Sequence, residues 1–316
     1  MLEEPGTKRH TVRLSGDRAR GARITASVLG ELTGVLLDAT RGALRVRVEG
    51  RSTAHGSVPA WLRAAADFDI LGIETGSTVL VIEAPALSEA APALFRQQEL
   101  FEPIDSNDSA FGVMEQTLRA AVDGSSDSDF FDQPLLSTFR RFERVLAAGF
   151  SSIELTNGGK SGHRVVVDRE SVAAVDHLIR ATPQPQRTRV SGTLDTIRHS
   201  DRMFTLVLED GKAAKGIADG VAVEQLAALF GQRVVVAGTA VFRPSGALLR
   251  IEADSIDAAA ADAAVWSRIP VPLFRNIDTT ALRQPQGPRS GVNAIIGRWP
   301  GEESDEEVAG ALTELS

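Results

Sequence analysis

The chain has 316 residues, enough for two or three domains, and its 43% hydrophobic content can build ordinary cores. Its formal net charge of -8 argues against nucleic-acid affinity of the whole protein, because nonspecific binding needs clustered Lys and Arg against phosphates. The absence of cysteine excludes disulfides, thiolate nucleophiles and zinc sites with cysteine ligands.

The first two thirds of the chain show an α+β pattern. Residues 1–20 are charged and contain glycine, so we expect a disordered start followed by a mixed α/β body over residues 21–182. Periodicity predicts helices over 26–37, 59–66, 110–122, 135–148 and 171–180, and strands over 44–48, 70–73, 78–82, 153–155 and 164–167. The polar loop 123–132 is interpreted as a solvated connector between helices. The proline-rich run 182–186 cannot continue a helix and marks the end of the body.

Residues 187–257 carry a sharper pattern of strands. We expect three strands, over 190–197, over 203–209 and in a run that ends at 217. A short helix is expected over 226–230, and two more strands over 233–241 and 248–253. A helix between the third and fourth of five strands is the order of a small OB-type barrel. We therefore predict an OB-like five-stranded β-barrel in this region.

A barrel of this type raises the alternative of a binding module for single-stranded nucleic acid or a protein partner. OB folds often bind single strands through stacked aromatic side chains and a basic groove. Phe204 alternates in phase with Leu206 and Leu208, which places it in the core. The arginines that could line one face are Arg189, Arg198, Arg202, Arg243 and Arg250. This pattern argues against nucleic-acid binding through the barrel, which stays open as the alternative.

The sequence offers no catalytic constellation, and we expect neither an enzyme nor a bound metal or cofactor. The histidines are scattered, without metal-ligand spacing, and are expected at surface or turn positions: His10, His55, His163, His177 and His199. The string 158–161, Gly-Gly-Lys-Ser, lacks the earlier glycine of a phosphate-binding loop and precedes a strand. No apolar run reaches the ~18 residues of a membrane span and the start lacks a secretory signal, so we expect a cytoplasmic location without membrane contact.

The end of the chain has the pattern of a tethered docking peptide. Residues 258–292 are rich in proline and predict a linker, and residues 293–316 predict a flexible tail with a short amphipathic helix. Ser304 and Glu307 have the spacing of a capping box at the start of that helix. Acidic residues crowd its positive end, while one stripe is apolar and Trp299 precedes it as a large anchor. We expect the tail to bind a partner.

The same segment resembles a known protein family. Ile-Gly-Arg-Trp-Pro-Gly-Glu-Glu-Ser-Asp-Glu-Glu from residue 296, ending in Ala-Leu-Thr-Glu-Leu, is similar to the C-terminus of antitoxins encoded beside PIN-domain ribonucleases of the VapBC type. The likeness covers about the last 25 residues. Family members more often have Asp and Thr where this chain has Glu302 and Ser304, and they are usually short.

The resemblance implies an inhibitor of a PIN-type ribonuclease toxin. It implies that Arg298 reaches the toxin's metal-binding carboxylates, that Trp299 is the anchor, and that a helix from Asp305 to Leu315 clamps the partner. The expected partner-binding residues are Arg298, Trp299, Pro300, Val308, Ala311, Leu312 and Leu315. The sequence alone leaves open what the large body contributes, whether the chain regulates its own operon, and its oligomeric state.

Overall fold

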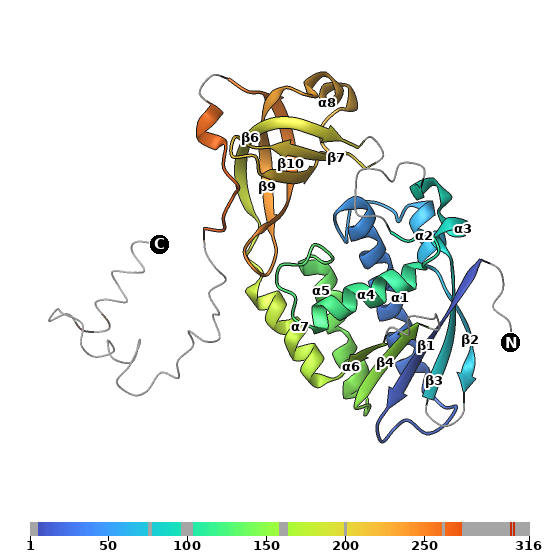
Figure 1. Cartoon of the computed structure of the whole chain (residues 1–316). Coiled ribbons are helices and arrows are strands. Elements are labelled where there is room, and N and C mark those ends of the chain that lie inside the picture. The colour runs from blue at the N-terminus through green and yellow to red at the C-terminus, as the bar shows by residue number, and fades with distance from the viewer. Residues whose placement is uncertain are drawn as a thin grey trace. The chain divides into compact units, whose positions relative to one another are not determined.

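The computed structural model of the chain describes residues 6–74, 78–95, 104–157, 164–198, 201–260 and 263–273, together with Ser304 and Glu306. The chain divides into two units, Met1–Asn276 and Ile277–Ser316. The first unit contains an α+β body and a closed β-barrel (Figure 1).

The body is built on a five-stranded sheet in the order β2-β3-β1-β4-β5. Its strands are β1 Thr7–Ser15, β2 Asp69–Glu74, β3 Thr78–Pro85, β4 Ser152–Asn157 and β5 Arg164–Val167. Neighbouring strands are antiparallel throughout.

The expected disorder of residues 1–20 is wrong for β1, which lies at the centre of the sheet. β3 and β4 pair with it on its two sides. Val12 and Leu14 are fully buried while Arg13 between them is exposed, which is the alternation of a strand with one face in a core. The body therefore begins at the start of the described chain and not at residue 21.

Seven helices with described bounds belong to the body. They are α1 Ala26–Glu49, α2 Ala60–Ala66, α3 Leu87–Ala90, α4 Ala110–Val122, α5 Gln133–Arg140, α6 Phe142–Ala147 and α7 Arg169–Ala181. Side chains of α1, α4, α5 and α7 share one hydrophobic core with the sheet, in which Leu36, Phe111 and Phe139 are almost completely buried. Ser109, Asp132 and Asp168 each accept a backbone hydrogen bond as N-caps, of α4, α5 and α7 respectively.

Two predictions for the helices need correction. The strand expected over 44–48 is part of α1, which continues until Gly50 takes a left-handed conformation at φ 72°. Leu44 packs into a small cluster with Leu62, whereas Val46 packs into the main core. Because this end of the helix is buried on more than one side, its apolar residues mimic strand alternation. The helix expected over 135–148 is divided at Arg141 into α5 and α6.

The predicted barrel is confirmed as a closed five-stranded barrel in the order β10-β8-β7-β6-β9. Its strands are β6 Gln186–Ile197, β7 Met203–Val207, β8 Ala213–Ile217, β9 Arg233–Phe242 and β10 Leu248–Ala258, with α8 Val223–Leu229 between β8 and β9 along the chain. The β8 and β10 pair is parallel and the other pairs are antiparallel. Phe204, Leu206 and Leu208 are buried in its core, as their phase predicted.

The segment after β10 starts differently from the predicted linker. A 3-10 helix, η2 Ala263–Trp266, follows the barrel. The amide of Gln186 in β6 donates to Val271 O at 2.7 Å and accepts from Leu273 N at 3.0 Å. Residues 263–273 therefore lie along the barrel, and a linker can begin only after them. Among the described helices, none has the length and apolar character needed to cross a membrane.

Candidate functional site

The sequence-predicted partner-binding residues lie outside the part of the chain that the structure describes. These are Arg298, Trp299, Pro300, Val308, Ala311, Leu312 and Leu315. Within the predicted tail, Ser304 and Glu306 are described, and both are exposed. The docking role of the tail stays a prediction.

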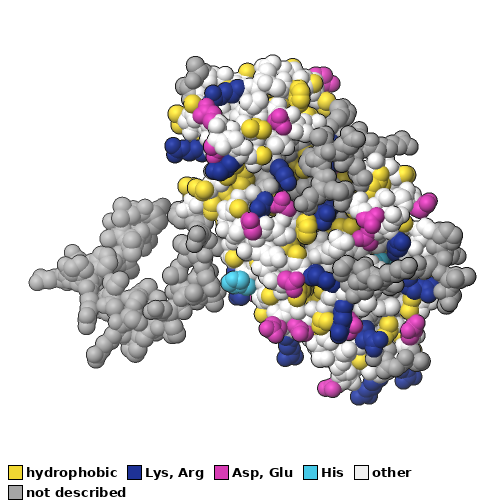
Figure 2. All heavy atoms as spheres, viewed as in Figure 1, with side chains coloured by type: hydrophobic (Ala, Val, Ile, Leu, Met, Phe, Trp, Pro, Cys, Tyr) yellow, Lys and Arg dark blue, Asp and Glu magenta, His cyan; other side chains and the backbone are white. Residues whose placement is uncertain are grey.

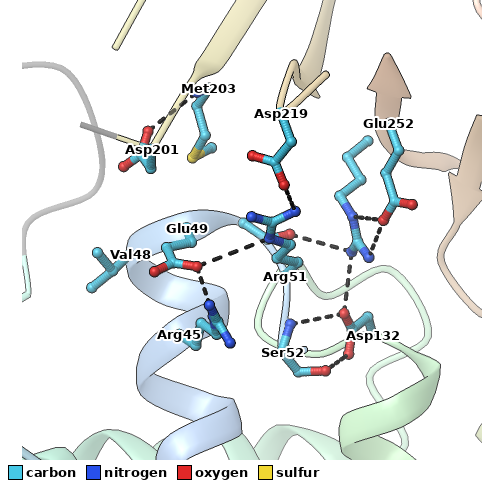
Figure 3. A network of polar contacts seen from close by, with 12 residues as sticks. Arg45, Val48, Glu49, Arg51, Ser52, Asp132, Asp201, Met203, Asp219 and Glu252 are labelled. Carbon is cyan, nitrogen blue, oxygen red and sulfur yellow. Dashed lines mark hydrogen bonds and ion pairs between the residues drawn. The ribbon is translucent and has the colours of Figure 1, made fainter. Parts of the chain in front are cut away.

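The described residues instead bring together a polar network where the body meets the barrel (Figure 3). At its centre Arg250 Nη1, from β10, donates to Asp132 Oδ2 at 3.2 Å and to Gly50 O at 3.2 Å. Glu252 Oε1 accepts two further bonds from the same guanidinium, at 2.9 and 3.0 Å. Ser52 donates to Asp132 through both its backbone N–H and its hydroxyl. Asp132 is thus at once the cap of α5 and an acceptor for Arg250 of the barrel.

The end of α1 supplies the other half of this network. Arg45 Nε lies 2.6 Å from Glu49 Oε2 across one helical turn, and Arg51 forms an ion pair with Asp219 of the barrel. The left-handed Gly50 ends the helix between these groups, and a Cβ there would lie 3.1 Å from the Met203 side chain of β7. Glycine therefore allows both the turn and the close approach of the barrel.

A second, more exposed set of contacts joins the polar loop 123–132 to the barrel. Arg243 Nη1 lies 3.0 Å from Asp127 Oδ1, and its Nη2 lies 2.5 Å from Asp129 Oδ1. Lys215 Nζ of β8 lies 3.5 Å from Asp129 Oδ2, and Ser245 donates to Asp127 at 2.8 Å. The hydrogen bonds from Arg243 and then Ser245 lower the pKa of Asp127. The loop connects α4 to α5 and residues 123–127 are exposed, as expected of a solvated connector, but three of its carboxylates also bind barrel cations.

A partly open cavity of about 110 Å³ lies between the two sets of contacts. It is lined by Val46, Arg47, Gly50, Asp129, Phe130, Met203, Lys215, Gly216, Ile217, Leu249 and Arg250. The Arg47 guanidinium lies over the Phe130 ring, 4.3 Å from its centroid. Body and barrel thus meet through charged and polar groups around an incompletely filled space.

These contacts account for several of the arginines that could have lined a nucleic-acid face. Arg243 and Arg250 are paired with carboxylates of the loop, and Arg198 donates to Val48 O at the end of α1. Figure 2 shows basic and acidic side chains interspersed over the face in view, without a continuous basic area among the described residues there. The exposed surface of the described chain in this view therefore lacks the basic stripe that nonspecific binding needs.

A buried cluster in the body was missed by sequence reasoning. His10, expected at the surface, lies in β1 with its Nε2 2.8 Å from Ser109 Oγ and its Nδ1 3.4 Å from Glu115 Oε1. Burial raises the pKa of Glu115. A substrate cannot reach the hydroxyl without opening the core, since the three residues are at most 3% exposed. The phase of His10 with Val12 and Leu14 could have predicted its burial.

The described residues contain no group of three or more His, Cys, Asp or Glu side chains that could hold a metal ion. Comparison with known protein families, with curated proteins and with solved structures finds no match for the chain.

Proposed function

We propose that the chain is an antitoxin-like inhibitor that binds and neutralises a PIN-type ribonuclease in the cytoplasm through its C-terminal segment. The observation that carries this proposal is the division of the chain between Asn276 and Ile277. Every residue of the resemblance falls in the second unit, whereas the sheet and the closed barrel belong to the first. A docking segment needs such independence, because it must be free to bind a partner without unfolding a core.

The proposed inhibition is electrostatic and steric. Ribonucleases of this type hold a divalent cation with clustered carboxylates, so an inserted guanidinium competes with the metal and blocks access of RNA. Arg298 suits this role because arginine stays charged and binds carboxylates through two parallel hydrogen bonds. Trp299 and Pro300 would anchor the segment, and Val308, Ala311, Leu312 and Leu315 would lie on the partner as one apolar stripe. The chain itself performs no catalysis in this scheme.

We also propose that the barrel is of the OB type. Its support is the strand order, the parallel pairing of β8 with β10, and the position of α8 between the third and fourth strands. OB folds bind oligonucleotides on the face of the second and third strands, with help from the loop between the fourth and fifth. In this chain these elements are β7, β8 and residues 243–247.

Nucleic-acid binding by the barrel is the second candidate function, favoured by the cations on this face. Lys215 and Arg243 lie there, but both are paired with carboxylates of the body. We therefore rank it below inhibition by the tail, and we expect the intact chain to bind oligonucleotides no more tightly than roughly 10⁻⁵ M, within the nonspecific range.

The test of the main proposal is a truncation after Val292. Residues 1–292 should keep the cooperative melting transition of the full chain, yet lose binding to the ribonuclease encoded by the adjacent gene in titration calorimetry. Unchanged binding by the truncated chain would contradict the proposal. Loss of the melting transition would mean that the segment belongs to a core.

A further inference from the structure

Three barrel cations that face the body are neutralised by one short loop. Asp127, Asp129 and Asp132 lie within six residues of one another, and they pair with Arg243, Lys215 and Arg250, which come from β8, β10 and the turn before β10. One loop therefore contributes its carboxylates to cations from separate barrel elements. A polyanion crossing this face would make the same kind of contacts, since each phosphate is an acceptor of charge-assisted bonds.

The exposed and the buried pairs differ in what they can do. Asp132 and Arg250 are buried and hold further hydrogen bonds to Ser52 and Gly50, so they form a fixed anchor. The Asp127, Asp129 and Lys215 side chains are 68%, 42% and 52% exposed, whereas the Arg243 side chain is 21% exposed. Exposed ion pairs contribute little to stability because solvent and salt screen them. Asp127 and Asp129 therefore contribute little to holding the body against the barrel. A competing anion can replace them at their contacts.

The place of these contacts on the barrel suggests which anion. If the barrel is of the OB type, as proposed above, β8 and residues 243–247 belong to the surface on which such folds bind oligonucleotides. The cavity of about 110 Å³ beside Lys215 shows that the loop does not close-pack against this surface. Phe204 of β7 is buried, so recognition here would depend on the phosphate backbone more than on stacked bases.

We propose that this face of the barrel, with Lys215 and Arg243 as its phosphate contacts, is a binding site for single-stranded nucleic acid that the body keeps closed. Asp127 and Asp129 occupy the positions of two phosphates, and the Arg250–Asp132 anchor holds the loop in place. The inference rests on the proposed OB-type assignment and is independent of the tail. A nucleic acid gains access when the two exposed carboxylates are neutralised or displaced.

The experiment compares full-length variants in fluorescence anisotropy with labelled 20-nucleotide oligo-dT and oligo-U. Asp127→Asn with Asp129→Asn removes the two exposed carboxylates and should bind at least about tenfold more tightly than the wild type, with an affinity that falls steeply as salt rises. The matched control is Glu31→Gln with Asp38→Asn, which changes the net charge equally at the distant pairs with Arg141 and Arg144. Tightening with either polymer supports the site, and the preferred polymer identifies its ligand.

Adding Arg243→Gln and Lys215→Gln to the first variant should abolish the gain. The proposal is overturned if the first variant binds no more tightly than the control, or if the gain survives loss of both cations. Should the double variant fail to fold by circular dichroism, Asp129→Asn alone decides, because this carboxylate meets both cations; an affinity equal to that of the wild type rejects the site. All variants retain Arg298 and Trp299, so failure here leaves the proposed inhibition by the tail untouched.

Discussion

Arg250 of a barrel strand and Asp132, the N-cap of a body helix, form a buried ion pair. Arg250 is 7% exposed and Asp132 is 2% exposed. They are 118 residues apart in sequence. A buried pair of this kind is costly to break, because removing one partner leaves an uncompensated charge.

Asp132→Ala is therefore expected to lower the free energy of unfolding by about 3 kcal/mol or more. The change also removes the hydrogen bond from Leu135 N that caps α5. Asp127→Ala, at an exposed pair, should cost less than about 1 kcal/mol. Urea denaturation of both variants checks the contrast, and equal losses would show that the buried pair is not the anchor.

The His10 cluster predicts a pH dependence of stability. Burial raises the pKa of Glu115 above its ordinary value of 4.5, and burial also raises the pKa of Asp108 nearby. The folded state then holds these protons more tightly than the unfolded state. The contribution of Glu115 to stability is fully present below pH 4.5 and is lost as the pH rises through the raised pKa of this group. His10 and Arg119 oppose the shift by favouring the charged form of Glu115.

Glu115→Gln should flatten this fall of stability with rising pH. Asp127→Asn is the control of opposite sign, because the pKa of Asp127 is lowered. The contribution of Asp127 to stability is present above pH 3.8 and is lost as the pH falls through the lowered pKa. Thermal melts at a series of pH values separate the two. An identical slope in Glu115→Gln and the wild type would show that Glu115 keeps an ordinary pKa in the folded chain.

Gly238 of β9 lies where the barrel leaves no room for a side chain. It lies opposite the irregular pairing at Ala253 of β10, and an added Cβ would lie 2.9 Å from the Ala253 Cα and still closer to Glu252 O. Gly238→Ala should therefore lower the free energy of unfolding by about 1–3 kcal/mol through overpacking. Gly220→Ala is the matched control, because its nearest atom is Asp254 O at 3.7 Å. Equal melting temperatures for the two variants would contradict this explanation.

The sequence predicts local patterns well and long-range contacts poorly. Strands such as β9 and helices such as α4 were predicted because their apolar periodicity is regular along each element. The end of α1 was mistaken for a strand because Leu44 and Val46 enter different cores. The role of the acidic loop could not be predicted, since Asp127 binds a residue 116 positions away. The candidate site in the tail remains a prediction from sequence.

Trp299→Ala tests the proposed anchor. If the indole is buried in a partner, its loss should weaken binding by about 2–4 kcal/mol, because large aromatic side chains dominate interface energetics. Glu302→Gln should have a much smaller effect, because a single charge contributes less to the energetics of an interface than a large aromatic anchor does. Titration calorimetry with the ribonuclease encoded by the adjacent gene measures both. Equal affinities for the two variants would exclude Trp299 as the anchor.

The most direct test of the proposed inhibition uses the ribonuclease encoded by the adjacent gene. Its activity on a labelled RNA is measured with an equimolar amount of the full-length chain at increasing Mg²⁺. We expect inhibition at low Mg²⁺ that weakens as Mg²⁺ rises, because Arg298 and the metal compete for the same carboxylates. Arg298→Gln should inhibit much less than the wild type at the lowest Mg²⁺ concentration. Undiminished ribonuclease activity in the presence of the wild-type chain would contradict the proposed function.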